Sequence, residues 1–372
     1  MDLESLSTPS LVLELDRLKR NAQRIGDRVR QLGARLRPHI KTHKCVEVAR
    51  LQTAGHSGAI TVSTLAEARA FAAGGFQDIT YAVPIEPGKF AAAIDLAKSL
   101  ETFNLITDDA SVPALLNQSA EDAGVVVNLF LKVDCGTHRC GVDPNSPEAE
   151  QIPRLIAEAS HLHFAGLLTH AGHSYHCATH GERLAVAAQE RDVMRELADR
   201  LRASGIDVPI VSVGSTPTIA AVDHLEGIDE ARPGNYIFFD AFQATAGSCG
   251  FGDCAMTVLA AVVHRDRTRG KVVLDAGAIA LSKDRGPVDF DPDAGYGRLL
   301  DLEGKDLGLR INSLSQEHGE AHGETAVIDR LKVGTRVRVV PNHSCLTAAQ
   351  HAFYNVVENG RVMDRWVIQR GW

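Results

Sequence analysis

The sequence predicts an α/β fold in which a (β/α)8 TIM-like barrel is followed by a C-terminal β-rich domain. Up to about residue 245, short β-branched runs alternate with longer amphipathic stretches, and this unit recurs about eight times. After about residue 250, short strand-like runs are separated by Gly and Asp turns, and helical periodicity is largely absent. An open doubly wound sheet is the alternative for the first part, because a count of strand–helix units from one sequence can err by about one or two.

The elements of the predicted barrel follow from hydrophobic periodicity. Residues 16–32 place apolar side chains three and four positions apart, which is one face of a helix, and Asp16 is the expected N-cap. An extended run over 34–40 and a helix ending near residue 52 follow. Further strands are expected at 58–62, 78–83, 103–106, 125–133, 164–169, 209–213 and 236–239, and helices at 65–71, 110–116, 148–157 and 181–201.

The C-terminal part of the sequence is predicted to form a second domain. Strands are expected there at 256–263, 271–275, 326–328, 335–340 and 362–368. The barrel is therefore placed at 12–248 and the β domain at 249–372, with the junction in the glycine-rich stretch 245–253.

Composition narrows the class of protein. The chain has 372 residues, and 39 Lys and Arg against 47 Asp and Glu leave a net charge of −8, which argues against nucleic acid or an anionic membrane as a partner. No apolar run is long enough to span a bilayer, and the acidic N-terminal stretch does not resemble a secretory signal. Seven Cys, an odd number, fit reduced thiols in a cytoplasmic enzyme.

A basic segment over 37–44 lies at the carboxyl end of an early strand, where catalytic groups of parallel barrels collect. If the strand continues, Arg37, His39 and Lys41 share one face. A Lys that points inward from a strand end is costly to bury as a cation, which is the situation of a Schiff-base lysine. A solvated basic strand end is the simpler interpretation of this segment taken alone.

Two neighbouring segments are candidates for a phosphate cradle. In the first, a buried strand runs into Gly214, Ser215 and Thr216 before a helix, and backbone N–H groups with hydroxyls suit a phosphate there. In the second, Arg232 and the Gly-Asn-Tyr run 234–236 could close the same site. An ordinary N-capped helix is the alternative for the first segment, but two adjacent candidates favour phosphate.

Two further segments follow apolar strands. Arg139 lies between Gly136 and Gly141, which suits a fixed guanidinium, although a turn with a surface Arg fits equally. His170 and Tyr175 occupy a loop in which the His ring could pack on a cofactor and the Tyr could exchange a proton. The four His of this loop could instead bind a metal or be solvated; they are His170, His173, His176 and His180.

The β domain carries one candidate metal pair. His343 and Cys345 are two residues apart, so on a strand they would share a face and could bind one ion. Two protein ligands would leave open positions for water or substrate, as in catalytic zinc sites. The segment 316–319, which contains His318, could supply a third polar contact or be a surface turn.

Seven segments occur in the order seen in one enzyme family. They are RPHIKTHK at 37–44, the run 132–141, THAGHSY at 169–175, SVGSTPT at 212–218, GNY at 234–236, QEHG at 316–319 and PNHSCLTAAQH at 341–351. Together they resemble a family of metal-dependent enzymes that use pyridoxal 5′-phosphate (PLP) as cofactor. This family includes D-threonine aldolase and eukaryotic-type D-serine dehydratase. The resemblance covers residues 8–372 and implies the alanine racemase-like fold, in which the first residues, 1–11, join the β domain as a strand.

The resemblance implies a role for each matching residue. Lys41 would be the Schiff-base lysine, Arg139 would contact the phenolic oxygen of PLP and His170 would lie against the pyridine face. Arg232 stands where alanine racemases place an Arg on the pyridine nitrogen. The implied phosphate contacts are Ser215, Thr216, Gly234, Asn235 and Tyr236, and the implied metal ligands are His343 and Cys345.

Two positions help to choose within the family. Cys345 stands where D-threonine aldolases tend to have Asp, and Tyr175 stands where they place a catalytic His. Cys with Tyr is similar to zinc-dependent D-serine dehydratases and to D-threo-3-hydroxyaspartate dehydratases, and a soft thiolate favours Zn²⁺ over Mg²⁺ or Mn²⁺. The resemblance therefore implies D-serine dehydratase activity with PLP and Zn²⁺, Lys41 as base, a small D-amino acid as substrate and a cytoplasmic homodimer.

Several alternatives stay open. A D-threo-3-hydroxyaspartate dehydratase would need an extra cation for the β-carboxylate, such as Lys283 or Arg285. A D-threonine aldolase would release glycine and an aldehyde. A non-catalytic PLP-carrier protein shares the Lys-bearing barrel, but such carriers are single barrels. A racemase is disfavoured because no counterpart is evident of the catalytic Tyr that its second subunit supplies. No role is assigned to His173, His176, His180 or His318.

Overall fold

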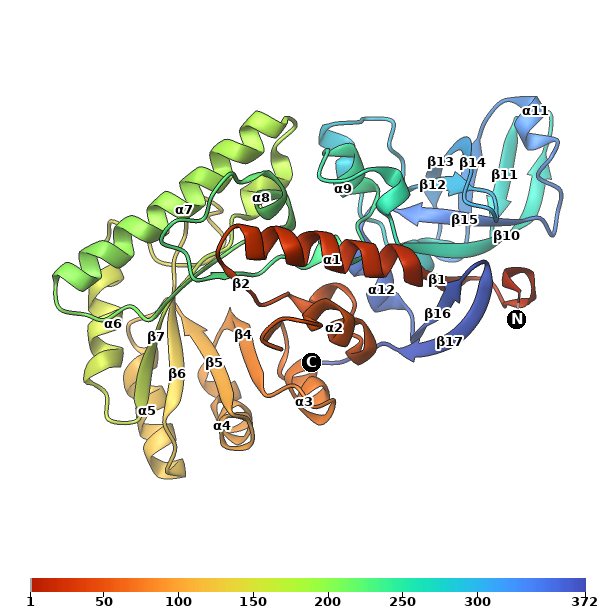
Figure 1. The fold of residues 1–372 in the computed structure, drawn as a ribbon. Helices are drawn as coiled ribbons and strands as arrows, with labels where there is room; N and C mark the ends of the chain where they lie inside the picture. Colours follow the sequence, from red (N-terminus) through yellow and green to blue (C-terminus); the bar gives the residue numbers. More distant parts are fainter. Residues whose placement is uncertain (1) are drawn as a thin grey trace. The chain divides into compact units, whose positions relative to one another are not determined.

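The computed structural model describes residues 2–372, and the chain divides into two compact units (Figure 1). The first, called here the barrel unit, comprises Arg24–Lys41, Val48–Gly234 and Gln369–Trp372. The second, the β unit, contains the residues up to Gln23 together with Thr42–Glu47 and Asn235–Ile368. The boundary expected near residue 248 stays a prediction.

The barrel unit is built on eight parallel strands in the order β2-β9-β8-β7-β6-β5-β4-β3. A parallel bridge between His39 and Thr61 joins the chain just after β2 to β3 and closes the sheet. The predicted (β/α)8 barrel is thus confirmed. The strands are β2 (Arg35–Leu36), β3 (Ile60–Val62), β4 (Asp78–Pro84), β5 (Thr102–Thr107), β6 (Val127–Lys132), β7 (Leu162–Leu168), β8 (Ile210–Val213) and β9 (Glu230–Ala231).

Local signals in the sequence set the bounds of the barrel helices. Thr64 caps α3 by accepting from the N–H of Glu67, and a reciprocal capping box of Thr179 and Glu182 starts α7. Asp16 is not the N-cap of the first helix, which begins one residue earlier. The helices are α1 (Leu15–Gln31), α2 (Val46–Thr53), α3 (Leu65–Ala73), α4 (Phe90–Ser99), α5 (Val112–Ala123), α6 (Glu148–Glu158), α7 (His180–Ala203) and α8 (Thr216–Ala221).

The prediction of a strand at 236–239 is wrong. That segment begins with a 3₁₀ turn, η5 (Asn235–Ile237), in which the carbonyl of Asn235 accepts from the N–H groups of Phe238 and Phe239. Phe239 has a φ of 48°, so the chain turns instead of extending. The aromatic run predicted a strand because its side chains are buried, and the true eighth strand is the two-residue β9.

The β unit contains a nine-stranded sheet in the order β11-β14-β13-β12-β15-β10-β1-β16-β17. An additional pairing of β11 with β10 closes six of these strands into a barrel, and the N-terminal β1 lies between β10 and β16. The strands are β1 (Ser10–Glu14), β10 (Met256–Asp266), β11 (Lys271–Leu274), β12 (Gly297–Leu300), β13 (Asp306–Leu314), β14 (Gly319–His322), β15 (Arg336–Pro341), β16 (Phe353–Glu358) and β17 (Arg361–Val367). A β-rich C-terminal part is confirmed.

Short helices interrupt the β unit, and one of them corrects a predicted strand. Residues 326–328 belong to α11, because the carbonyl of Glu324 accepts from the N–H of Ile328 and so makes a helical turn. The helices are α9 (Ala241–Thr245), α10 (Ala278–Leu281), α11 (Thr325–Ile328) and α12 (Ser344–Gln350). Within residues 2–372, no helix combines the length and apolar character that a membrane span requires.

Candidate active site

Lys41 lies in a tight turn and not on an extended strand. The extended backbone ends at His39, and Lys41 belongs to the 3₁₀ turn η2 (Ile40–Thr42). The ring nitrogen Nδ1 of His39 accepts from the N–H of Lys41 at 3.4 Å, and its Nε2 lies 3.4 Å from the hydroxyl of Ser63. The predicted shared face of Arg37, His39 and Lys41 is therefore wrong: Arg37 is buried, whereas the Lys41 side chain is exposed.

The turn that carries Arg139 is attached to the loop that carries His170. Asp134 accepts from the N–H groups of Gly136 and Thr137, both at 2.9 Å, which fixes the turn. Thr137 then donates its hydroxyl hydrogen to the carbonyl of His170 at 2.8 Å. The Arg139 side chain is exposed, so its guanidinium is available to a ligand.

His170 is surrounded by positive charge. Burial lowers its pKa well below the ordinary value, and the nearby Lys41 and Lys132 lower the pKa further. The ring nitrogen Nδ1 lies 3.3 Å from the carbonyl oxygen of Gly214. The imidazole is thus neutral at pH 7. Its flat ring can pack on a cofactor without adding to the positive charge nearby.

Glu190 was not predicted, and it connects the loops that follow two neighbouring strands. This buried carboxylate, on α7, accepts from the N–H of Ala171 and from the N–H of Gly214, both at 3.0 Å. Beside this link, Ser215 caps α8, and its hydroxyl lies 3.1 Å from that of Ser174. Ser215 and Thr216 are both buried, and the Thr218 hydroxyl completes the cap, so their role as phosphate contacts stays a prediction.

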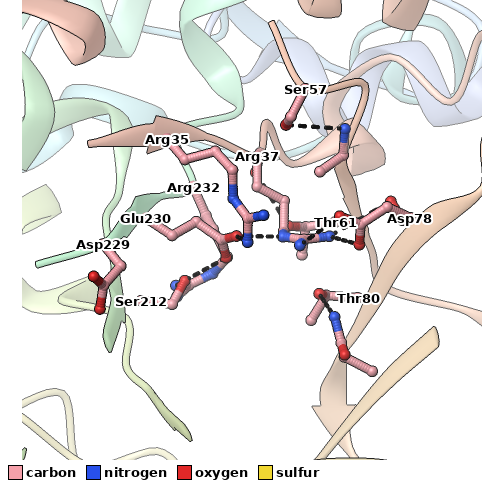
Figure 2. Close-up of polar contacts among 12 residues, drawn as sticks. Arg35, Arg37, Ser57, Thr61, Asp78, Thr80, Ser212, Asp229, Glu230 and Arg232 are labelled. Atoms are coloured by element: carbon pink, nitrogen blue, oxygen red, sulfur yellow. Dashed lines mark hydrogen bonds and ion pairs between the residues drawn. The ribbon is translucent and has the colours of Figure 1, made fainter. Parts of the chain in front are cut away.

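Arg232 ends a buried polar network inside the barrel (Figure 2). Its guanidinium donates to the hydroxyl of Ser212 and to the carbonyl of Thr169, and burial lowers its pKa to about 10. Ser212 in turn donates to Glu230 at 2.7 Å, and Glu230 accepts from Arg37 at 2.6 Å. Glu230 was also missed, because only the fold brings it beside Ser212 and Arg37.

The predicted metal pair lies in the β unit, at the start of α12 and not on a strand. His343 is the N-cap residue of α12, and Cys345 lies in its first turn. The ring nitrogen Nδ1 of His343 lies 2.7 Å from the carboxylate of Asp284. Burial lowers the pKa of His343, but the Cys345 thiolate and the Asp284 carboxylate raise it to about 11. The two predicted ligands are therefore in contact.

The donor set fits a soft divalent ion. An imidazole and a thiolate are ligands that Zn²⁺ prefers, and a carboxylate behind a ligating His is a common supporting contact. No group of three or more His, Cys, Asp and Glu side chains that could hold a metal is found over residues 2–372. An ion at His343 and Cys345 would thus retain open positions. His318 lies in an exposed turn, where its backbone carbonyl accepts from the N–H of Ser315 at 2.9 Å, and its role as a third contact stays a prediction.

The remaining predicted residues are placed as follows. Gly234 is buried after Pro233, whose carbonyl accepts from the N–H of His39 at 3.0 Å. Tyr236 is fully buried in η5, and Tyr175 is partly buried in η4 (Gly172–His176). The amide nitrogen of Asn235 donates within the β unit, and its Oδ1 is buried without a hydrogen-bond partner. An unpaired acceptor does not suit a phosphate, so Asn235 could serve one only through its backbone.

Comparison with known proteins identifies the family. Residues 13–241 match the model of the alanine racemase N-terminal domain, and residues 255–357 match that of a putative serine dehydratase domain. The chain belongs to the alanine racemase-like family. Within this family it carries a C-terminal region that matches a putative serine dehydratase domain. The family resemblance predicted from the seven ordered segments is confirmed.

Two relatives match this chain over its whole length. It is 38% identical to D-threo-3-hydroxyaspartate dehydratase of Delftia sp. (strain HT23), covering 100% of this chain and 99% of that protein. It is 33% identical to D-serine dehydratase of Dictyostelium discoideum, covering 100% and 98%. The solved structure of the Delftia enzyme covers 100% of both chains at 37% identity with a TM-score of 0.97.

Proposed function

We propose that the chain catalyses the β-elimination of water from D-3-hydroxy amino acids, with PLP and Zn²⁺ as cofactors. The observation that carries the proposal is the contact of His343 with Cys345 beside Asp284, a donor set suited to Zn²⁺. The same chain carries Lys41 near the neutral His170 in its barrel. Lyase activity on D-hydroxy amino acids is the activity that the family assignment supports.

The barrel residues fit an anionic aromatic cofactor. Lys41, Lys132 and Arg139 all contribute positive charge at His170, and this charge would be balanced by the phosphate and phenolate of PLP. Bound PLP supplies an electron sink for the α-carbon of the substrate. Lys41 would hold the cofactor in the resting enzyme and accept the α-proton on its Nζ, while His170 packs against the ring without contributing charge.

The metal residues fit the departure of a hydroxyl group. Bound Zn²⁺ supplies Lewis acidity to the β-hydroxyl, which is otherwise a poor leaving group. Asp284 occupies Nδ1 of His343 and so leaves Nε2 as the ligating nitrogen. Tyr175 would donate or accept a proton beside the His170 loop. Loss of water gives an enamine, which takes up water again on hydrolysis to the keto acid and ammonia.

A specific observation favours D-threo-3-hydroxyaspartate as a substrate alongside D-serine, which the sequence alone favoured. Lys283 and Arg285 flank Asp284, whose carboxylate contacts His343, and both side chains are exposed. A cation at this position would neutralise the β-carboxylate that hydroxyaspartate has and serine lacks. The higher identity to the D-threo-3-hydroxyaspartate dehydratase agrees with this ranking.

A substrate panel tests the proposal. The purified enzyme is incubated with D-serine, D-threonine and D-threo-3-hydroxyaspartate, and pyruvate, oxaloacetate, ammonia and glycine are measured. Keto acid with equimolar ammonia is expected, whereas glycine with an aldehyde would show an aldolase. No turnover of any substrate by the PLP-loaded, zinc-loaded chain would contradict the proposal and favour a PLP carrier.

Two variants connect the activity to the site. Lys41→Ala should lose the visible absorbance of bound PLP, and Lys98→Ala, which changes an exposed lysine of α4, should retain it. Arg285→Gln should lower kcat/KM for D-threo-3-hydroxyaspartate far more than for D-serine. Equal losses for both substrates would remove the argument for a β-carboxylate contact. Light scattering of the same samples tests the implied homodimer.

A further inference from the structure

Asp240 is a buried carboxylate that no predicted role includes. It is 1% exposed and caps α9, where its Oδ1 accepts from the N–H of Gln243 at 2.9 Å. Its other oxygen, Oδ2, accepts from the amide nitrogen of Asn235 at 2.7 Å and from the backbone N–H of Ser344 at 2.9 Å. The hydroxyl of Ser344 donates to the same oxygen at 3.1 Å. Asp240 therefore connects Asn235 to the first turn of α12, which contains Cys345.

These contacts fix which way the Asn235 amide faces. The oxygens of Asp240 already accept from backbone N–H groups, so they act as acceptors toward their other neighbours. The group that Asn235 presents to Asp240 must then be its nitrogen, a donor, and not its oxygen. An amide turned the other way would place two acceptors 2.7 Å apart.

The same amide nitrogen faces the sulfur of Cys345. Nδ2 of Asn235 lies 3.8 Å from Sγ, within the range of an N–H to sulfur hydrogen bond, and 3.1 Å from the Ser344 hydroxyl, which shares its second N–H. Thr42 Oγ1 lies 3.3 Å from Sγ. A metal-bound thiolate is an acceptor, and the N–H group of Asn235 offers the matching donor. Thr42 can reverse its hydroxyl to donate as well, because a hydroxyl both donates and accepts.

We propose that Asp240 is a positioning residue for the metal-binding thiolate of Cys345. It orients the Asn235 amide so that nitrogen faces sulfur, and it holds the backbone of Ser344, the residue directly before Cys345. The inference rests on the proposed function, in which Cys345 is a metal ligand. Supporting groups of this kind typically change metal affinity or activity by about 10- to 100-fold when they are removed.

The substitution Asp240→Asn tests the inference with almost no change in shape. An Asn at this position keeps one acceptor and gains a donor, so it cannot accept from Gln243 and from Asn235 with Ser344 at the same time. The Asn235 amide is then free to turn its oxygen toward the sulfur, where it repels a thiolate. The metal should bind more weakly and in a changed geometry.

Co²⁺ alone is the probe, titrated into the full-length, PLP-loaded enzyme after chelation. Its ligand-field bands in the visible region report coordination geometry, and their growth with concentration gives the Kd. For Asp240→Asn we expect a Kd raised by about tenfold or more and altered bands. Asp275→Asn is the matched control, because Asp275 likewise accepts from a backbone N–H, of Ala261, and from a hydroxyl, of Thr8. This control should leave the Kd and the bands unchanged.

The outcomes separate the two levels of the proposal. Bands in the wild type that Cys345→Ala does not change would show that Cys345 is no ligand, which refutes the metal site of the proposed function. Bands that depend on Cys345 but are identical in Asp240→Asn would overturn the role of Asp240 alone. If Asp240→Asn does not fold by circular dichroism, Asn235→Ala decides, with PLP content checked by absorbance. A wild-type Kd and spectrum in that variant would likewise overturn the inference.

Discussion

A buried lysine of the barrel makes the sharpest prediction on stability. Lys132 ends β6 and is 5% exposed, and its ammonium donates to the carbonyl of Val133 at 3.4 Å. Burial and the positive charge of Arg232 lower its pKa to about 8. Lys132→Met, which keeps the length and apolar stem of the side chain, should therefore stabilise the chain from which PLP has been removed.

The magnitude follows from linkage. At pH 7 the lysine is protonated in both the folded and the unfolded states, and a pKa lowered from 10.5 to about 8 corresponds to a burial cost of about 3 kcal/mol. As pH rises through 8, the folded chain releases the proton while the unfolded chain keeps it, so the cost falls. At pH 9.5 about 1.5 kcal/mol should remain. The advantage of Lys132→Met should thus be largest below pH 8 and shrink toward pH 10.

Urea unfolding of the cofactor-free proteins at pH 7 and pH 9.5 measures this difference. Lys98→Met, which changes an exposed lysine of α4, controls for the loss of a positive charge and should shift stability little at either pH. With PLP bound, the anionic cofactor should compensate the lysine, so the difference between wild type and Lys132→Met should decrease. A Lys132→Met chain that is less stable than wild type at pH 7 without PLP would refute the reasoning.

Three other perturbations have equally definite outcomes. Glu230→Gln should lower the free energy of unfolding by about 3 kcal/mol, because it removes a buried carboxylate from Arg37, which retains Asp78, and from the nearby buried Arg232; an unchanged urea midpoint would contradict this. Gly166→Ala should abolish folding, since φ is 127° and a Cβ would overlap the carbonyl of Ile210, whereas Gly181→Ala, with open space, should leave the melting temperature unchanged or higher. His170 has a lowered pKa in the folded state, so the unfolded state binds the proton first as pH falls below about 6.5 and stability decreases. His170→Gln should reduce this acid destabilisation, and an identical slope of melting temperature against pH would count against it.

The parts of the fold that the sequence predicted are those with strong local signals. Apolar runs such as the one ending at Lys132 marked the barrel strands, and repeated strand–helix alternation marked the barrel itself. The two-residue strand β9 could not be found, because its pairing depends on neighbours distant in sequence and not on its own composition. The aromatic run after Asn235 predicts a strand in its place, because an apolar composition does not distinguish a buried strand from a buried turn.

The candidate site residues divide in the same way: some have a strong local signal in the sequence, and others are brought into contact only by the fold. Lys41 and His343 stand in ordered motifs whose residue types and neighbours are specific, so the sequence alone singles them out as candidates. Carboxylates that contact candidate residues lie outside the motifs and meet them only through the tertiary fold of each unit: Glu190 in the barrel unit, and Asp240 and Asp284 in the β unit. A buried polar side chain needs a partner, so such carboxylates become visible once the backbone is known.

The proposed role of Zn²⁺ is tested most directly by one measurement on the wild-type protein. Keto acid formation from D-threo-3-hydroxyaspartate and D-serine is followed before chelation, after chelation and after Zn²⁺ is restored, with PLP content monitored by its absorbance throughout. Chelation should abolish keto acid formation while PLP stays bound, and Zn²⁺ should restore it. Full activity in the chelated, PLP-bound enzyme would contradict the assignment of His343 and Cys345 as the groups that hold the catalytic ion.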